Sequence, residues 1–197
     1  QSIGALALDV HESKADFLSC GAMKWLLGTP GLGFFYAAWR HLGKMPHRAG
    51  YAGAVRDTNP WGQRKFRPKR GAGRFELGVL NLMGLAASAP GLEMLLDVGM
   101  KRVEAHVLDL SGFCIEGLLS RGLNVLTPRA PQHRAGIVAI QMRNAAGAFQ
   151  YLCDRGVDTY LRDGSLRVDP HIFNNRDDIA RFLSELDGWL GRGRKQY

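Results

Sequence analysis

Hydrophobic residues in the second half of the chain follow two spacings, one helical and one typical of strands. They recur about every three or four positions over residues 91–121 and again after Asn175, which predicts a long helix and a final helix. Residues 136–142 form a short apolar run that predicts a strand. A further helix is expected over residues 144–155, and Asp163-Gly164 predicts the turn of a β-hairpin. The pattern indicates a small α+β domain after one long helix.

The first half of the chain has shorter apolar runs, which glycines and prolines separate. Strands are expected near residues 5–8, 16–19 and 33–37. We expect these strands to form part of a parallel-type sheet, so the fold class predicted for this half is α/β.

The composition is that of an ordinary soluble globular protein, with 46% hydrophobic and 22% charged residues among 197. No apolar run is long enough to span a bilayer, so no membrane partner is expected. The three cysteines are widely spaced and match neither a disulfide framework nor a zinc pattern, which favours the cytoplasm. Glu104, His106 and Asp109 do not share one helix face well, so no metal site is expected.

The net charge of +8 raises the question of a nucleic-acid partner. The loop 64–74 begins with a basic run, and Trp61 and Phe66 are interleaved with it, so it could grip phosphates and stack on bases. The alternatives are a solvated loop and a loop at a subunit interface. We favour these alternatives over nucleic acid, because runs of charge are usually solvated surface.

Lys24 lies between two apolar segments that end and begin strands. Burial disfavours the charged form of a lysine, and a neutral amine can form a Schiff base with a carbonyl group. The alternative is a surface lysine at a loop end, with its stem lying on Trp25. The chemistry of this residue alone favours the surface lysine.

Three short motifs follow one another along the chain. They are Lys-Trp-Leu-Leu-Gly at 24–28, Arg-Phe-Glu-Leu-Gly at 74–78 followed by Asn81, and Arg-Val-Asp-Pro-His-Ile-Phe-Asn-Asn at 167–175. The second resembles Arg-Phe-Glu-x-Gly-Thr-x-Asn, and the third resembles Arg-x-Ser-Pro-His-x-Tyr-Asn, of the class V aminotransferases. That family comprises fold-type I pyridoxal 5'-phosphate (PLP) enzymes, among them cysteine desulfurases, kynureninases and isopenicillin N epimerase-like proteins. The resemblance covers essentially the whole chain.

The resemblance implies PLP as cofactor and Lys24 as the lysine that carries it. Gln1 resembles a glutamine that hydrogen-bonds the cofactor's phenolic oxygen, although a frayed terminus is the alternative. Val79 stands where the family has a threonine that reaches the partner's phosphate, so only its backbone N–H could serve. Arg167 matches the arginine that holds the substrate carboxylate in a bidentate fork. The alternative for Arg167 is a surface arginine paired with Asp169 or Asp163.

Some positions depart from the family pattern. Gly21 and Met23 replace a serine and a histidine that reach the phosphate in many members, and Ser19 is a candidate substitute. His171 matches a family histidine to which we assign no role. Cysteine desulfurases carry a cysteine soon after the substrate arginine, and Ile172 is the nearest equivalent here, which argues against desulfurase chemistry.

The resemblance also implies the domain organisation and the reaction class. We expect the C-terminal part of the PLP-binding large domain in 1–89, a linking helix in 90–122 and the small α+β domain in 123–197. The chain then corresponds to the C-terminal half of an amino-acid-transforming enzyme, of the aminotransferase, epimerase or C–S/C–C lyase type. A homodimer, or a partner chain that supplies the N-terminal half, is expected, and the isolated chain is expected to be inactive. The alternative is a non-catalytic interaction module.

Overall fold

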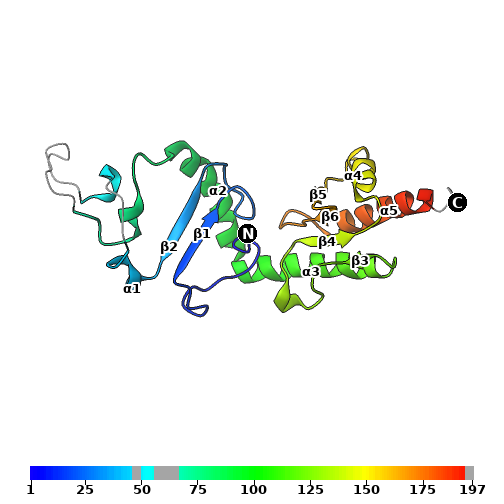
Figure 1. The fold of residues 1–197 in the computed structure, drawn as a ribbon, viewed down its shortest axis with the longest axis horizontal. Helices are drawn as coiled ribbons and strands as arrows, with labels where there is room; N and C mark the ends of the chain where they lie inside the picture. Colours follow the sequence, from blue (N-terminus) through cyan, green and yellow to red (C-terminus); the bar gives the residue numbers. More distant parts are fainter. Residues whose placement is uncertain (46–49, 56–66, 194–197) are drawn as a thin grey trace. The chain divides into compact units, whose positions relative to one another are not determined.

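The computed structural model describes residues 1–45, 50–55 and 67–193, and in it the chain divides into two compact units. Unit 1 comprises Leu8–Asp97 together with Gln1 and Ile3, and unit 2 comprises Val98–Tyr197 together with Ser2 and Gly4–Ala7. Both units combine helices with a sheet (Figure 1), which confirms the predicted mixed fold class.

Unit 1 is built on a two-stranded antiparallel sheet. Its elements are β1 (Phe17–Gly21), β2 (Gly33–Ala37), α1 (Trp39–Leu42), the short 3-10 helices η1 (Tyr51–Gly53) and η3 (Ala72–Phe75), and α2 (Leu82–Val98). The two strands lie side by side in Figure 1, with Phe17 opposite Ala37 and Gly21 opposite Gly33.

The expected parallel-type sheet in this half is wrong, and so is the strand expected at 5–8. Residues 22–32 reverse the chain through turns, whereas parallel neighbours need a longer crossover, usually a helix. Residues 5–8 contain a turn and a single bridge position instead of a strand. Two strands that follow one another closely pair as antiparallel neighbours because the connection between them is short.

The single helix expected over 91–121 is also wrong. The chain forms α2 (Leu82–Val98), which contains Pro90 in its interior, and then α3 (Met100–Leu119). Gly99 separates them with a φ of +87°, a backbone conformation that a right-handed helix cannot include and that glycine adopts most readily. Among the described residues, no single helix is long and apolar enough to cross a membrane. Only α2 and α3 taken together reach that length and apolar composition.

Unit 2 is a four-stranded antiparallel sheet with helices packed on one face. Its strands, in the spatial order β3-β4-β6-β5, are β3 (Asn124–Val125), β4 (Val138–Gln141), β6 (Ser165–Val168) and β5 (Tyr160–Arg162). Its helices are α3, η4 (Pro131–His133), α4 (Ala145–Cys153) and α5 (Arg176–Gly193). Alternate strand residues such as Ile140 and Leu166 are fully buried against side chains such as Leu118 and Leu186.

Several local predictions for unit 2 are confirmed. The strand expected within 136–142 is β4, and the expected hairpin joins β5 to β6. Asp163 and Gly164, with φ values of 49° and 74°, form its turn, as a two-residue hairpin turn requires. The Asn175 side chain accepts hydrogen bonds from the backbone N–H groups of Asp177 and Asp178, which caps α5. The hairpin turn and the start of α5 are therefore set by the chemistry of nearby residues.

Candidate cofactor pocket and carboxylate-binding strand

Lys24 lies in the loop between β1 and β2, and backbone hydrogen bonds close this loop. The Ala22 N–H donates to the Leu32 carbonyl at 2.9 Å, and the Gly28 N–H donates to the Ala22 carbonyl at 2.8 Å. The Leu27 N–H donates to the carbonyl of Lys24 itself at 3.0 Å. The backbone that carries Lys24 is thus tied into a defined turn.

Packing against α2 holds the same loop from the other side. Trp25 and Leu26, which follow the lysine, are only 5% and 7% exposed. The Thr29 N–H donates to the Ser88 hydroxyl at 2.9 Å. A Cβ added at Gly28 would lie 2.7 Å from the Ala22 Cβ, so this position has no room for a side chain. The small and apolar residues around Lys24 serve to fix the loop.

A cavity of about 180 Å³ lies beside this loop in unit 1. It is lined by Gln1, Ile3, Ser19, Cys20, Gly21, Met23, Lys24 and Trp25. The fold therefore brings together Gln1 and Lys24, two of the three residues that sequence analysis assigned to the cofactor. Lys24 is exposed, as the surface-lysine alternative had it, and its side chain lies at the wall of an open pocket.

The groups around this cavity fit PLP in kind. Lys24 offers an amine, Gln1 an amide and Ser19 a hydroxyl, while Ile3 and Trp25 provide apolar wall. A Cβ added at Gly21 would meet no atom within 4 Å, so the absence of a side chain there leaves open space. An amine can form a Schiff base with the aldehyde of PLP, while a neutral hydrogen-bonding side chain and apolar wall suit its aromatic ring.

Val79 does not line this cavity. It lies between η3 and α2, outside any helix or strand, and is 82% exposed. Its backbone N–H as a contact to a partner's phosphate stays a prediction.

Arg167 belongs to unit 2, on β6, where Ala139 of β4 and Tyr160 of β5 are its cross-strand neighbours. Its guanidinium carbon lies 5.8 Å from the centre of the Tyr160 ring. Its Nη2 donates to Asp169 Oδ2 at 2.9 Å, so the pairing weighed as the alternative is present. The side chain is 16% exposed, which leaves part of the guanidinium open to a ligand.

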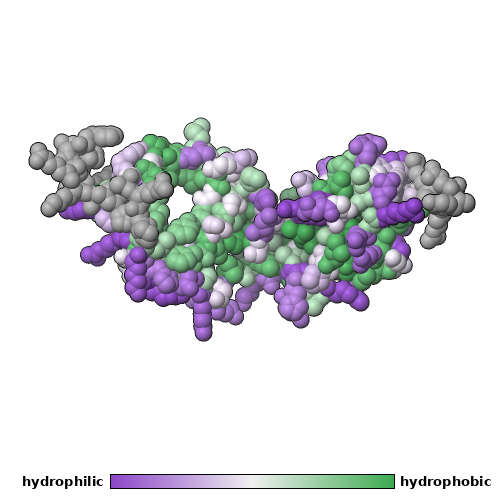
Figure 2. Space-filling view, in the orientation of Figure 1, coloured by the Kyte–Doolittle hydropathy of each residue, from purple (hydrophilic) through white to green (hydrophobic). Residues whose placement is uncertain are grey.

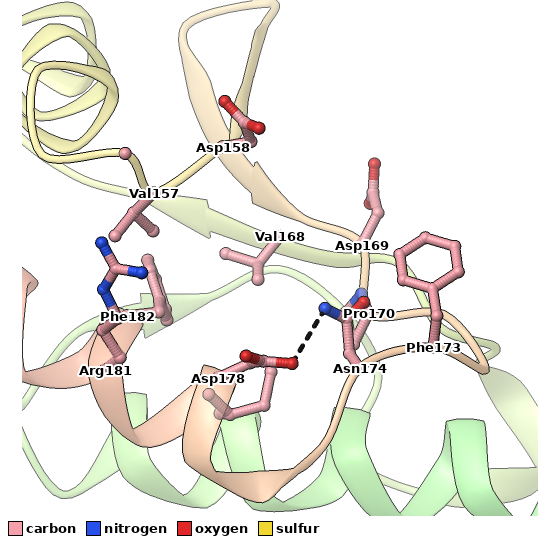
Figure 3. Close-up of a pocket in the computed structure, with 12 residues that line it drawn as sticks. Val157, Asp158, Val168, Asp169, Pro170, Phe173, Asn174, Asp178, Arg181 and Phe182 are labelled. Atoms are coloured by element: carbon pink, nitrogen blue, oxygen red, sulfur yellow. Dashed lines mark hydrogen bonds between the residues drawn. The ribbon is translucent and has the colours of Figure 1, made fainter.

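A second cavity, of about 440 Å³, lies in unit 2 and was not predicted. Figure 3 shows its lining from the β6 end and from the start of α5, with Asp158, Asp169, Asp178 and Arg181 as the charged groups. The backbone N–H of Asn175, followed by the side chain of Asn174, lowers the pKa of Asp178. None of the four predicted site residues lines this cavity. Its lining residues all lie within 156–182, but sequence analysis linked them by no motif or spacing rule.

The other candidate groups have structural partners. His171 is 7% exposed, its Nδ1 accepts from the Ile172 N–H at 2.7 Å, and its ring stacks on Phe173 at 5.0 Å. Glu104 accepts from the Ala7 N–H at 2.7 Å, while Asp109 binds Arg176. Within the described ranges, no three His, Cys, Asp or Glu side chains gather as a metal site requires.

The basic loop is described only in part, because Trp61 and residues 64–66 lie outside the described residues. In the described part, Lys69 pairs with Glu76 at 3.0 Å. Arg74 donates to the carbonyls of Lys69 and Leu42. These two cations contact groups of the chain itself, so nothing in the described loop supports the nucleic-acid alternative.

Comparison with known proteins gives a consistent result. Residues 1–170 match the family Aminotransferase class-V. A kynureninase of Stenotrophomonas maltophilia is 27% identical over 202 residues, which cover 96% of this chain and 48% of that protein. The chain spans about half the length of the curated relatives it matches.

Solved structures share the fold. A cysteine desulfurase of Thermococcus onnurineus in its apo form matches with a TM-score of 0.83 at 21% identity, over 96% of this chain and 50% of that one. A variant of the cystine C–S lyase C-DES, with glycine covalently linked to its PLP cofactor, matches with a TM-score of 0.84 at 21% identity. That match covers 94% of this chain and 49% of the lyase.

Proposed function

Because the chain belongs to the class-V aminotransferase family, we propose that it forms part of a PLP-dependent enzyme that acts on an amino acid. The reaction is of the aminotransferase, epimerase or C–S/C–C lyase type. One observation carries the proposal: Gln1 and Lys24, far apart in the sequence, line one cavity whose donor groups suit PLP. The relatives, a kynureninase among them, support the reaction class.

In this proposal each residue has a defined task. PLP, when bound, supplies an electron sink for the bond that is broken at the substrate's α-carbon. Lys24 provides the amine that attaches the cofactor, and its Nζ can afterwards hold or deliver a proton. Gln1 donates a hydrogen bond from its amide. The packed loop around Trp25 and Leu26 keeps the amine in position.

Arg167 binds the carboxylate of the amino acid. A guanidinium offers a planar fork of N–H donors that matches a carboxylate, so it orients the substrate as well as attracting it. Loss of such an anchor weakens substrate binding more than it affects the attachment of the cofactor to Lys24. The two residues therefore have separable roles.

We further propose that unit 1 associates with a second copy or with a chain that supplies the N-terminal half. Large apolar side chains are exposed over its sheet and over α2, as the hydrophobic surface there in Figure 2 shows. They include Phe17 48%, Phe34 46%, Leu82 65%, Met83 83% and Leu96 71%. Large apolar side chains left in water in such number favour a protein interaction site. A cytoplasmic location, proposed from the cysteine pattern, accords with such an assembly.

The direct test is chemical trapping on Lys24. The chain is mixed with PLP, reduced with borohydride and mapped by mass spectrometry, alongside the variants Lys24→Ala and Lys44→Ala. Lys44 is a matched control, because it is an exposed lysine of the same unit. We expect the main adduct at Lys24, its loss in Lys24→Ala and its retention in Lys44→Ala. Equal labelling of all exposed lysines would contradict the proposal. Amino-acid turnover by the isolated chain would instead contradict the expectation that this chain is inactive by itself.

A further inference from the structure

Arg167, the proposed anchor for the substrate, already holds a carboxylate of its own chain. Asp169 lies two positions further along the chain, and its Oδ2 accepts from Arg167 Nη2 at 2.9 Å. The two side chains are 16% and 35% exposed, so the pair is partly shielded from water. Partial burial strengthens such an ion pair relative to one on an open surface.

The remaining surroundings of the guanidinium limit what else it can bind. Its Nε is buried and has no hydrogen-bond partner among the described residues. Tyr160 lies to one side of it, at the cation–π distance given above. A ligand carboxylate must therefore bind the terminal Nη groups, one of which already contacts Asp169.

Asp169 is placed to face Arg167 and not the interior of the neighbouring cavity. In Figure 3 its carboxylate points away from Asp178 and Asn174, although its backbone lies at the cavity wall. In the sequence, Asp169 stands at the position where the motif Arg-x-Ser-Pro-His has serine. A neutral hydroxyl in the motif is thus replaced by a charged group directed at the anchor.

We propose that Asp169 is an internal competitor of the substrate carboxylate and sets the affinity of Arg167 for its ligand. The inference rests on the proposed role of Arg167. Asp169 neutralises the charge of the guanidinium and occupies one of its N–H donors. An incoming carboxylate has to displace Asp169 or share the fork with it, and in the shared arrangement two like charges meet. The site consequently binds a simple carboxylate weakly.

The test measures carboxylate binding by the full chain without any cofactor. Propionate and, separately, L-alanine are titrated while the Nε–H signal of Arg167 is followed by NMR on protein with labelled arginine. Asp169→Asn keeps an oxygen that can accept from Arg167 but removes the charge. We expect this variant to bind propionate about tenfold more tightly, the size expected for removal of one like charge from a partly exposed site. Asp169→Ser is expected to change the affinity in the same direction.

Two further variants make the result specific. Asp163→Asn removes a carboxylate from the adjoining hairpin turn, where Asp163 pairs with Arg162 and asparagine tolerates the positive φ. This control should leave the affinity for propionate unchanged. Arg167→Lys keeps a positive charge but loses the planar fork, and its response to propionate, followed by backbone amide signals of β6, should be weaker than that of the wild type.

The outcomes separate the two proposals. Tighter propionate binding in Asp169→Asn alone supports internal competition. Equal binding in wild type and Asp169→Asn, or no binding in either, overturns it. If Asp169→Asn weakens L-alanine but leaves propionate unchanged, Asp169 contacts the ammonium group of the ligand and the inference is overturned. If Arg167→Lys binds propionate as the wild type does, the proposed role of Arg167 fails instead.

Discussion

The two units differ in how much of their apolar surface they cover. Unit 2 surrounds a continuous core in which Leu110, Leu118, Ile140, Leu166 and Leu186 are at most 1% exposed. Unit 1 has no comparable cluster among its described residues, and it leaves large side chains such as Met83 and Leu96 in water. Its helix α2 buries only Gly84, Ser88 and Leu95. Yet unit 1 contains the candidate cofactor pocket.

The difference teaches that a reactive loop can be held without a large core. The lysine loop depends on a few local contacts, namely its backbone hydrogen bonds, the buried Trp25 and Leu26, and the bond from Thr29 to Ser88. α2 is apolar over most of its surface, with Glu93 and Asp97 as its charged residues, and such a helix is normally buried on most sides. The loop is therefore complete in the described chain, whereas the helix behind it presents further apolar surface.

The largest expected effect comes from truncating a core leucine of unit 2. Leu186→Ala removes a fully buried side chain, and it should lower the free energy of unfolding by about 3 kcal/mol through lost burial and a residual cavity. Leu96→Ala in unit 1, where the side chain is 71% exposed, should change it by less than about 0.5 kcal/mol. Urea unfolding followed by circular dichroism measures both.

That comparison also detects association. If Leu96→Ala costs as much as Leu186→Ala, the exposed stripe of α2 is covered in solution, and the cost should then grow with protein concentration. If Leu186→Ala has no effect on unfolding, the core of unit 2 described above is wrong.

A smaller effect is expected from two of the asparagines that cap helices, Asn175 in unit 2 and Asn81 in unit 1. Asn175→Ala removes the acceptor for the first N–H groups of α5 and should destabilise unit 2 by about 1 kcal/mol. Asn81 accepts from the Gly84 N–H at 2.9 Å in the same way at the start of α2. Asn81→Ala should speed hydrogen exchange only in α2 and leave β4, β6 and α5 unchanged. Equal loss of protection in both units would show that they unfold together.

The smallest expected effect is on the stability of unit 2 at low pH. In unit 2, Arg121 lowers the pKa of Asp187 and Arg176 lowers the pKa of Asp109, in each case chiefly through a side-chain hydrogen bond. A carboxylate whose folded pKa is lowered stabilises the fold fully above its unfolded pKa, about 3.9, and loses that contribution as the pH falls through the folded pKa. Unit 2 should therefore lose stability below about pH 4.

Asp187→Asn should make this acid-induced loss shallower. Arg121→Gln, which removes the same ion pair from the other side, should do so to a similar extent. Both pairs are largely exposed, so the change will be small, and thermal melts at several pH values are the suitable measurement. If the stability of both variants falls with decreasing pH as steeply as that of the wild type, the Arg121–Asp187 pair does not cause this loss.

The correct predictions came from residues whose chemistry acts locally. Asn175 caps a helix, and Asp163-Gly164 adopts the positive φ angles of a hairpin turn, whatever the surroundings. The apolar run 136–142 contains β4 as expected. Gln1 and Lys24 line one pocket, and their roles stay predictions.

The wrong predictions concerned features that depend on contacts at a distance. Apolar residues occur on most sides of α2, so their spacing marked neither its start at Leu82 nor the separation from α3 at Gly99. The strands near 17 and 35 were found, but their antiparallel pairing depends on the path of the loop between them. For Lys24 the sequence left a buried amine and a surface lysine open, and the side chain is exposed beside a pocket.

By itself, the sequence determined the caps, the hairpin turn, the α+β character of the second unit and the motif order that identifies the family. Each of these depends on a backbone preference or a side chain acting within a few residues. Only the tertiary structure decided the antiparallel pairing of β1 with β2, the exposure of Lys24 and the contact of Arg167 with Asp169. These depend on which surfaces meet and on how far water reaches, which are properties of packing that spacing along a chain does not encode.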